Sequence, residues 1–302
     1  MQFKAITIED YPTIQPYLSS VSVPICEFSF LNLYGWAEYY STEWTILHSD
    51  ILVIRFKRET YDHPVYMLPQ CPCDYSRSQA IDELMTLSKE DSMPLVFYGV
   101  TRDCALLIEQ RFPGDFIFVW SDLLADYLYT RDKLLFLKGK KLQPKRNHIN
   151  QFDRLYPNHL YAPLTYSDVL EYKDFLEQWY ACQENIDASM IAEQRMVERV
   201  FAAFGQLDLL GGVIRVDGHI VALTIASQIN PTTVDVHIEK ALPGYKGLYA
   251  KINHSFVQTL PKTVEMINRE EDLGIPGLRK AKESYQPDLL LEKGRAIFYP
   301  IS

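Results

Sequence analysis

The segment between residues 211 and 259 restricts the fold of this chain more than any other part of the sequence. "GGVIRV" and "HIVALTIASQI" are apolar, β-branched runs joined by Asp217-Gly218, a two-residue turn that predicts a β-hairpin. "TTVDVHIEKA" predicts a third strand, and "LPGYKG" then places two glycines ahead of an amphipathic helix over 247–259. A hairpin and a long strand, followed by a glycine turn and a helix, predict a mixed α+β layer.

The first half of the chain carries strand and helix signals of its own. "WTILHSD", "ILVIRFK" and "PVYMLPQ" predict strands, residues 77–90 predict a helix, and "PLVFYGV", "RDCALLIEQRF" and "DFIFVW" continue the alternation. From residue 138 the sequence "KGKKLQPKRNHINQFDRLYP" is basic and poor in apolar side chains, which indicates a boundary. The 302 residues leave room for two domains, predicted as 1–140 and 141–302, each a mixed sheet flanked by helices.

Composition and charge narrow the class of protein. With 47% hydrophobic and 23% charged residues the chain has the balance of a soluble globular protein, and a net charge of −9 disfavours a general nucleic-acid binder. The N-terminus "MQFKAITIEDYPTIQPYL" lacks the features of an export signal, and no run reaches the roughly 18 apolar residues of a membrane span. The five cysteines are widely spaced, so we expect reduced thiols, a cytoplasmic protein and no metal site.

The predicted strand "TTVDVHIEKA" carries three ionisable side chains at two-residue spacing. Strand alternation would place Asp235, His237 and Glu239 on one side of the sheet and the apolar residues on the other. A general base must be held near the group that it deprotonates, and neighbouring carboxylates and a histidine shift one another's pKa values. We therefore predict a catalytic group here; a strand with one solvated face is the alternative and explains the pattern equally well.

The turn that follows is predicted to bind an anionic donor. Gly244, Lys246, Gly247, Tyr249 and Lys251 surround the start of the next helix. Backbone N–H groups at a helix start, together with the helix dipole, favour an anion, and the two lysines would add positive charge. The alternative is a simple connecting loop, because turns that contain glycine are far commoner than phosphate sites.

The order of the predicted elements resembles the GNAT acyltransferase fold. In that family the strand before the loop often supplies a base, and the loop grips the pyrophosphate of the donor. The usual loop is Gln or Arg, two residues, Gly, any residue, then Gly or Ala; here Gly244 and Tyr249 depart from it and only Gly247 matches. This departure weakens the expectation of coenzyme A as the donor.

Three longer motifs are more specific. "KGKKLQPKRNHINQF", "HIEKALPGYKGLYAKIN" and "INREEDLGIPGLRKAKESYQP" look like the C-terminal catalytic domain of phosphatidylglycerol lysyltransferases, which belong with the Fem-type peptidyltransferases. The resemblance covers 138–295 in motifs and nearly the whole chain in architecture. It implies two tandem GNAT-like (acyl-CoA N-acyltransferase-like) α+β domains, the first degenerate and the second catalytic. It also implies transfer of an aminoacyl group from aminoacyl-tRNA to an amine or hydroxyl acceptor such as a lipid head group.

Further polar side chains in these motifs are predicted to bind the acceptor or an anion. They are Asn268, Arg269, Glu270, Asp272, Arg279, Lys280, Lys282, Lys140, Lys141, Arg146 and Asn147. The residues at 268–272 would stand at the mouth of the acceptor groove. The basic residues would contact phosphates of tRNA, of coenzyme A or of a lipid head group. The alternative for the basic run at 138–146 is a solvated linker between domains.

The mechanism expected from this resemblance is direct attack by the acceptor, without a covalent enzyme intermediate. Glu239, with Asp235 or His237, would take the proton of the acceptor. Tyr285 stands where many GNAT enzymes place a tyrosine that protonates the leaving group, although a packed aromatic side chain near a helix end is the alternative. Aminoacyl-tRNA or acyl-coenzyme A would act as a cosubstrate, with no bound cofactor.

Two other functions remain open from the sequence. One is a coenzyme A-dependent N-acetyltransferase that acts on a small amine. The other is a non-catalytic GNAT-like module that binds a ligand in the same cleft. A lipid acceptor would imply peripheral contact with a membrane, and the sequence carries no signal for an oligomeric state.

Overall fold

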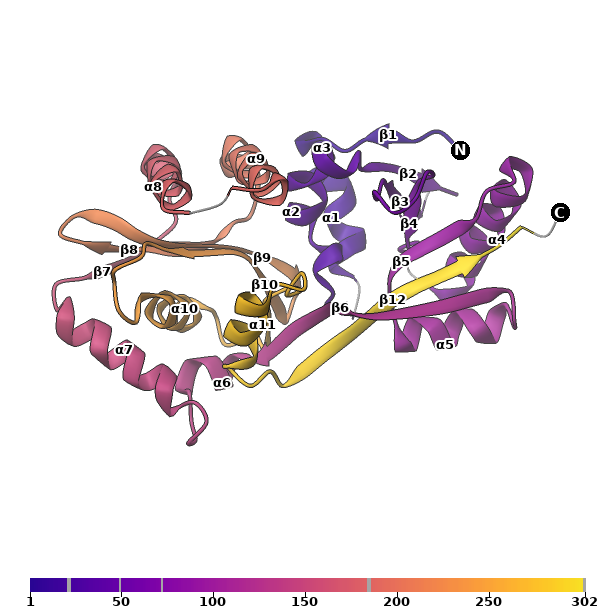
Figure 1. Ribbon diagram of the computed structural model, residues 1–302. Helices are drawn as coiled ribbons and strands as arrows, with labels where there is room; N and C mark the ends of the chain where they lie inside the picture. The colour runs from indigo at the N-terminus through magenta and orange to yellow at the C-terminus, as the bar shows by residue number, and fades with distance from the viewer. Residues whose placement is uncertain (21–22, 49, 72, 184–185, 301–302) are drawn as a thin grey trace. The chain divides into compact units, whose positions relative to one another are not determined.

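The structure is a computed structural model that describes residues 1–20, 23–48, 50–71, 73–183 and 186–300 (Figure 1). The chain divides into two compact units. The first unit comprises Met1–Asp126, Glu271–Leu273 and Leu290–Ser302, and the second comprises Tyr127–Glu270 and Gly274–Leu289. Among the described residues, no helix combines the length and the apolar character needed to cross a bilayer.

The units are interleaved along the chain, unlike the predicted division between residues 140 and 141. The chain leaves the first unit within strand β6 (Phe116–Thr130), because the last residues of β6 pair with strand β11 of the second unit. It returns along strand β12 (Leu289–Phe298), which pairs antiparallel with β5 of the first unit. Pairing between strands far apart in the sequence sets this division, and a change in local composition does not reveal it.

The first unit is built on a mixed sheet with the strand order β1-β2-β3-β4-β5-β12-β6. Besides β6 and β12, its strands are β1 (Lys4–Ala5), β2 (Glu43–Leu47), β3 (Ile51–Phe56), β4 (Val65–Met67) and β5 (Leu95–Thr101). Its helices are η1 (Ile8–Asp10), α1 (Tyr11–Ser19), η2 (Cys26–Phe28), α2 (Phe30–Gly35), α3 (Ala37–Tyr40), α4 (Asp74–Asp91) and α5 (Arg102–Arg111). Strands β4 and β5 are parallel and are connected by α4, and apolar side chains of α4 and α5 share one core cluster with β3, β5, β6 and β12.

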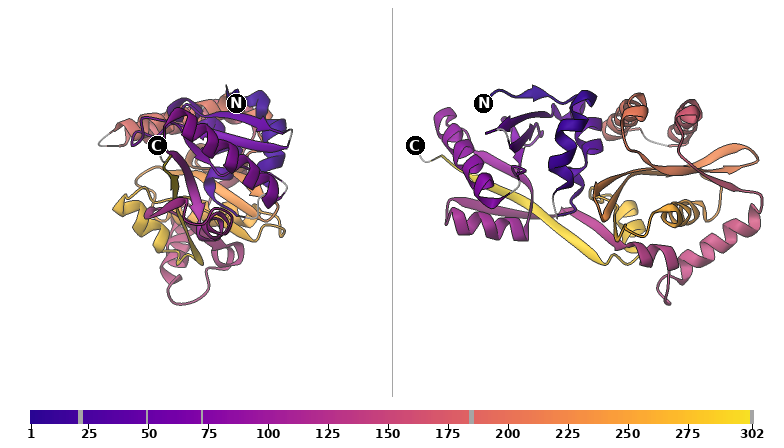
Figure 2. Two further views of the ribbon diagram at one scale, coloured as in Figure 1. Left: turned by 90° about the vertical axis from the view of Figure 1, so that its right-hand side faces the viewer. Right: turned by 180° about the vertical axis from the view of Figure 1, so that it is seen from behind.

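The second unit has the strand order β6-β11-β10-β9-β8-β7. Its further strands are β7 (Leu160–Pro163), β8 (Leu210–Val216), β9 (His219–Asn230), β10 (Thr233–Ala241) and β11 (Met266–Asn268). Its helices are α6 (Arg131–Phe136), α7 (Gln143–Leu155), η3 (Tyr166–Asp168), α8 (Val169–Ala181), α9 (Ala188–Ala202), η4 (Phe204–Gln206), α10 (Leu248–Thr259) and α11 (Pro276–Glu283). Helices α8 and α9 lie on one side of the β8–β9 hairpin and α10 lies on the other (Figures 1 and 2).

Local sequence explains several of these elements. The β8–β9 hairpin turns at Asp217 and Gly218, both of which have positive φ, as a two-residue turn of this type requires. Helix α9 begins after Asp187, whose carboxylate accepts a hydrogen bond from the Met190 backbone N–H. The basic stretch after residue 138, where the domain boundary was predicted, forms helix α7 over most of its length.

Strands β10 and β11 create an opening in the second sheet. They are parallel and are connected by α10, and their pairing covers three positions, of which Asp235 with Asn268 is the last. Beyond this point β10 continues to Ala241, paired with β9 alone, while Arg269 and Glu270 leave β10 and form backbone hydrogen bonds with Tyr127 of β6. The predicted site residues on β10 and after β11 therefore lie where the two strands diverge.

Candidate active site

Strand β10 is irregular at the position that carries the predicted catalytic side chains. Its pairing with β9 contains one extra residue between Val236 and Ile238, which is the pattern of a β-bulge. Val234 and Val236 belong to a core cluster with side chains of α10, and Glu239 also faces α10, because the Asn253 amide donates to it at 3.0 Å. Side chains of β10 therefore do not alternate regularly between the two faces of the sheet across the bulge.

Asp235 and His237 therefore face away from Glu239, and the prediction of one common polar face is wrong. His237 Nδ1 lies 3.5 Å from Asp235 Oδ2, so these two side chains share a side of the strand. Glu239 is on the side of Val234 and Val236. A bulge inserts one residue into the two-residue period, and this reverses the facing of every later side chain.

His237 is the centre of the first cluster. Its Nδ1 atom is 2.9 Å from Glu270 Oε1, and its Nε2 atom is 2.8 Å from Ser227 Oγ on the neighbouring strand β9. The His237 side chain is fully buried, and that of Glu270 is 26% exposed. Two carboxylates at Nδ1 favour a proton on that nitrogen, which leaves Nε2 as the acceptor that faces a hydroxyl. A hydroxyl, an imidazole and a carboxylate in this order can move a proton away from an attacking oxygen or nitrogen.

Glu239 is the centre of the second cluster. Arg269 Nη2 donates to Glu239 Oε1 at 2.8 Å, and the Asn253 amide donates to Oε2. The Arg269 guanidinium lies 5.0 Å from the centre of the Tyr285 ring, and Lys145 Nζ lies 3.9 Å from the same ring. Both oxygens of Glu239 thus accept hydrogen bonds, one of them from a guanidinium, whereas His237 Nε2 faces the Ser227 hydroxyl, which can pass a proton to it.

Burial sets the protonation states around the second cluster. Burial, together with the nearby positive charge of Arg269, lowers the pKa of Lys145 to about 8. Burial also raises the pKa of the Tyr285 phenol, which therefore stays neutral at ordinary pH and keeps a proton to donate. The ring of Tyr285 is almost wholly buried and packs in the core of the second unit. Both the proton-donor role and the packed-aromatic alternative for Tyr285 are consistent with this placement.

The predicted donor loop has the backbone that its glycines suggest. Gly244 and Gly247 have φ of 91° and 87°, and Gly247 directly precedes α10. Lys246 is exposed, and Tyr249 is half exposed at the start of the helix. Lys251, in contrast, forms an ion pair with Asp153 of α7 at 2.8 Å, so part of its charge is already balanced within the protein.

Substitutions at the two loop glycines should separate backbone strain from close packing. A Cβ atom at Gly247 would lie 2.1 Å from the His148 carbonyl oxygen, whereas a Cβ atom at Gly244 would meet nothing within 4 Å. Gly244→Ala should lower the free energy of unfolding by about 1 kcal/mol through positive-φ strain, and Gly247→Ala by at least about twice as much. Urea unfolding of the two variants tests this, and equal losses would contradict the packing of the loop against α7.

The remaining predicted residues near β11 separate into different environments. Asn268 is buried, and its side-chain oxygen accepts the Glu270 backbone N–H at 2.7 Å, so it shapes the turn that positions Glu270. Lys282 is also buried and donates to the Glu270 carbonyl oxygen at 3.1 Å. Asp272 belongs to the first unit, whereas 268–270 belong to the second. The structure thus does not assign Asp272 to the same unit as its predicted partners.

The predicted basic residues differ in how much charge they leave available. Lys140, Lys141 and Lys280 are exposed, and Arg279 is half-buried. Arg146 donates to the carbonyl oxygens of Leu137 and Gly139 and to Gln143, so its guanidinium closes the turn before α7. Asn147 is exposed and accepts a hydrogen bond from the Gln143 amide at 2.8 Å.

The site hypothesis from the sequence did not include Ser227 or Asn253, and it included Lys145 only as one member of the basic run at 138–146. Lys145 precedes Ile149 and Phe152 by four and seven residues, a spacing that places it on the buried face of α7 and could have separated it from the other lysines. Ser227 needs the register of β9 against β10, which the bulge makes unpredictable from the chain alone. The amphipathic pattern of α10 predicted a buried face but did not link Asn253 with Glu239.

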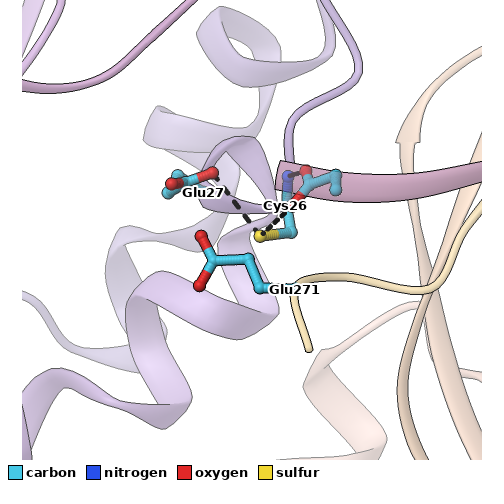
Figure 3. Close-up of side chains that lie close together, drawn as sticks. Cys26, Glu27 and Glu271 are labelled. Atoms are coloured by element: carbon cyan, nitrogen blue, oxygen red, sulfur yellow. Dashed lines mark hydrogen bonds between the residues drawn. The ribbon is translucent and has the colours of Figure 1, made fainter. Parts of the chain in front are cut away.

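Two groups of side chains bring potential metal ligands together among the described residues. Asp235, His237 and Glu270 form one, and Cys26, Glu27, Asp126 and Glu271 of the first unit form the other; within each, the ligand atoms lie within 4.8 Å of one another. In the first unit, a hydrogen bond joins the Cys26 sulfur to Glu27, and the Glu271 side chain lies beside them (Figure 3). Lys293 Nζ lies 2.7 Å from Glu27, 2.8 Å from Asp126 and 2.9 Å from Glu271, so an ammonium already holds the position that a cation would take.

Comparisons with known proteins agree with the observed architecture. A crystal structure of a conserved protein of unknown function from Bacteroides thetaiotaomicron is 36% identical, with a TM-score of 0.91 and coverage of 99% of both chains. The structure of L-PGS from Bacillus licheniformis is 14% identical, with a TM-score of 0.65 over 95% of this chain and 91% of that one. A tandem GNAT protein from the clavulanic acid biosynthesis pathway is 7% identical, with a TM-score of 0.51 over 100% and 99%. The last two likenesses concern the fold, which is α+β with tandem GNAT-like units, as predicted.

Among curated proteins, an uncharacterized protein of Mycoplasmoides gallisepticum is 24% identical over 172 residues, or 56% of this chain. The match spans about half the length of that relative, 54%. The family described as "Phosphatidylglycerol lysyltransferase, C-terminal" matches residues 21–295 of this chain. Family and fold together point to an acyltransferase of the lysyl-phosphatidylglycerol synthase type. The chain belongs to the phosphatidylglycerol lysyltransferase C-terminal family.

Proposed function

We propose that the protein transfers an aminoacyl group from aminoacyl-tRNA to an amine or hydroxyl acceptor, such as a lipid head group. The observation that carries this proposal is the hydrogen-bonded series Ser227–His237–Glu270 where β10 and β11 diverge. Family membership supports the class of reaction, and the name of the family supports an aminoacyl group as the one transferred.

In the proposed reaction His237 takes the proton of the acceptor. An acceptor hydroxyl or amine beside Ser227 would pass its proton to His237 Nε2, directly or through the Ser227 hydroxyl. Glu270, held by its hydrogen bond to Nδ1 and helped by Asp235, would stabilise the imidazolium that forms. The acceptor atom then attacks the ester carbonyl of the donor, the ester bond breaks, and the ribose oxygen leaves with a proton. Tyr285 lies in the Glu239 cluster, on the other side of β10 from His237, so we propose that the His237 imidazolium returns its proton to this ribose oxygen.

Thermal melting with candidate donors tests the donor class. The protein is melted with coenzyme A, acetyl-coenzyme A, charged tRNA and uncharged tRNA in parallel. A donor at a hundred times its dissociation constant should stabilise the folded protein by about 2.7 kcal/mol. The proposal predicts a shift with tRNA that weakens steeply with salt, because phosphate contacts release counterions. A shift with the coenzymes alone would favour the N-acetyltransferase alternative, and no shift with any of them would favour a binding module.

A further inference from the structure

Two cationic side chains of the second unit share one aromatic ring. Lys145 from α7 places Nζ 3.9 Å from the centre of the Tyr285 ring, and Arg269 places its guanidinium carbon 5.0 Å from it. The two cations come from segments that are far apart in the sequence and are held there by packing. Like charges in a half-buried site repel each other, so this arrangement needs a compensating negative charge.

The protein supplies only part of that compensation. Arg269 and Glu239 are the charged groups that act on Lys145, and the phenols of Tyr285 and Tyr129 beside Arg269 stay neutral, because burial raises their pKa values. Glu239 forms an ion pair with Arg269 at 2.8 Å, with 9% and 11% of the two side chains exposed. One carboxylate balances one cation, so a protonated Lys145 leaves the cluster with one excess positive charge.

A second observation at the same place points to a ligand. Arg269 Nη2 donates to Glu239, but Nη1 is buried and has no hydrogen-bond partner among the described residues. A guanidinium is always charged, and a buried donor without an acceptor is costly. A water molecule could accept from Nη1, but it would not balance the charge of Lys145. An oxyanion would do both.

We propose that Lys145 Nζ and Arg269 Nη1 form a subsite that binds a phosphate group of the donor. The guanidinium supplies a directed donor that is already held in place by Glu239, and the ammonium supplies a mobile charge on a flexible stem. The inference rests on the proposed function only for the statement that the phosphate belongs to the donor. The proposal gives this role to the half-buried Lys145 and not to Lys140 and Lys141, the exposed lysines of the same basic run.

Binding and protonation must be coupled at this subsite. An anion beside Lys145 favours its charged form, so phosphate should raise the pKa of Lys145 above its value of about 8. By the same linkage, phosphate affinity should fall as pH rises above 8, by up to about tenfold per pH unit, until the pKa of the bound state is reached.

The test measures the titration of Lys145 in the full-length protein. Reactivity with an amine-acylating reagent, mapped by mass spectrometry from pH 6 to 11, is compared in phosphate and in chloride at equal ionic strength. Lys145 should titrate near 8 in chloride and higher in phosphate. The exposed Lys262 of the same unit serves as an internal control, and its reactivity profile should be the same in phosphate and in chloride. A Lys145 titration that phosphate leaves unchanged would overturn the proposal.

Variants make the test specific to the two side chains. Lys145→Met keeps most of the packed stem and should weaken phosphate binding at least about tenfold, as expected for the loss of a charge-assisted hydrogen bond. Arg269→Lys keeps the charge beside Glu239 but removes the Nη1 donor, and it should also weaken binding. Lys262→Met should bind phosphate like the original protein. Equal affinity in Lys145→Met and Lys262→Met would refute the subsite.

Two further arms identify the source of the phosphate. Coenzyme A and uncharged tRNA are each tested for protection of Lys145 from acylation. Protection by either one supports a phosphate subsite and indicates which donor occupies it, and protection by neither contradicts a role in donor binding. If phosphate shifts Lys145 while no aminoacyl transfer is found, the proposed function fails and the phosphate subsite remains.

Discussion

Replacing Lys293 with methionine should lower the free energy of unfolding of the first unit by about 3–5 kcal/mol. Lys293 is wholly buried, and its ammonium contacts three carboxylates that are also largely or fully buried. Methionine fills the volume of the stem but removes the charge, which leaves Glu27, Asp126 and Glu271 without their ammonium partner. Removing one member of a buried ionic cluster is among the most destabilising single substitutions.

The loss of unfolding free energy in Lys293→Met should also depend on pH. In the wild-type protein, burial raises the pKa of Glu271 to about 7 despite Lys293. Without the ammonium, which lowers it, the folded-state pKa of Glu271 should rise further above its unfolded value. Such groups contribute stability that is fully present below the unfolded pKa and is lost as pH rises through the folded pKa. The variant should therefore be much closer to wild type at pH 5 than at pH 8.

Urea unfolding followed by tryptophan fluorescence measures both effects, because Trp36, Trp44 and Trp120 lie in the first unit. Lys4→Met is the matched control: Lys4 pairs with Asp10 at 2.9 Å in the same unit, but its side chain is 62% exposed. Asp10 is buried but also accepts hydrogen bonds from Thr7 and Trp44, so the loss of the exposed Lys4 ammonium should cost less than about 1 kcal/mol. If Lys293→Met and Lys4→Met cost the same, the buried cluster does not stabilise the unit in the way described here.

Replacing His237 with glutamine should reduce aminoacyl transfer by about 10²–10⁴-fold when chemistry limits the rate. Glutamine can keep hydrogen bonds to Ser227 and Glu270 but cannot take a proton from the acceptor. Glu239→Gln should reduce the rate less, because both oxygens of Glu239 already accept hydrogen bonds from Arg269 and Asn253. Single-turnover rates of the two variants give the comparison directly.

The matched control is His219→Gln, because His219 is exposed at the β8–β9 turn of the same unit. It should transfer at the wild-type rate, and urea unfolding should show that all three variants remain folded. A His237→Gln enzyme with full activity would exclude this histidine as the base. If Glu239→Gln were the only inactive variant, the base would be Glu239, as the sequence first suggested.

The parts of the fold that depend on short segments were predictable from the sequence. The Asp217-Gly218 turn, the strand before the glycine loop and helix α10 all follow from patterns within a few residues of each other, and the structure contains them. The order of these elements resembles the GNAT fold, and the tandem arrangement was implied by the resemblance to the phosphatidylglycerol lysyltransferase family. The passage of the chain from the first unit along β6 and back to it along β12 could not be predicted. It depends on the pairing of β6 with β11 and of β12 with β5, which are more than a hundred residues apart in the sequence.

The site was harder to predict for a related reason. Asp235, His237 and Glu239 were found by residue type, but one extra residue in β10 decides that they form two clusters instead of one. The partners Ser227, Glu270 and Arg269 reach β10 from other segments, and their contacts depend on strand register. For Arg146, the charge suggested a ligand contact, and the sequence did not show that its guanidinium also donates to the Leu137 and Gly139 carbonyl oxygens.

The most direct test of the central claim is a transfer assay with labelled aminoacyl-tRNA. The tRNA carries a radiolabelled amino acid and is incubated with the protein and with lipid vesicles or small amine and hydroxyl acceptors. The account predicts that label moves from tRNA to an acceptor, with loss of the activity in His237→Gln but not in His219→Gln. If label remained on the tRNA with lysyl and other aminoacyl donors at every acceptor tested, or moved equally well with His237→Gln, the proposed acyl transfer at His237 would be contradicted.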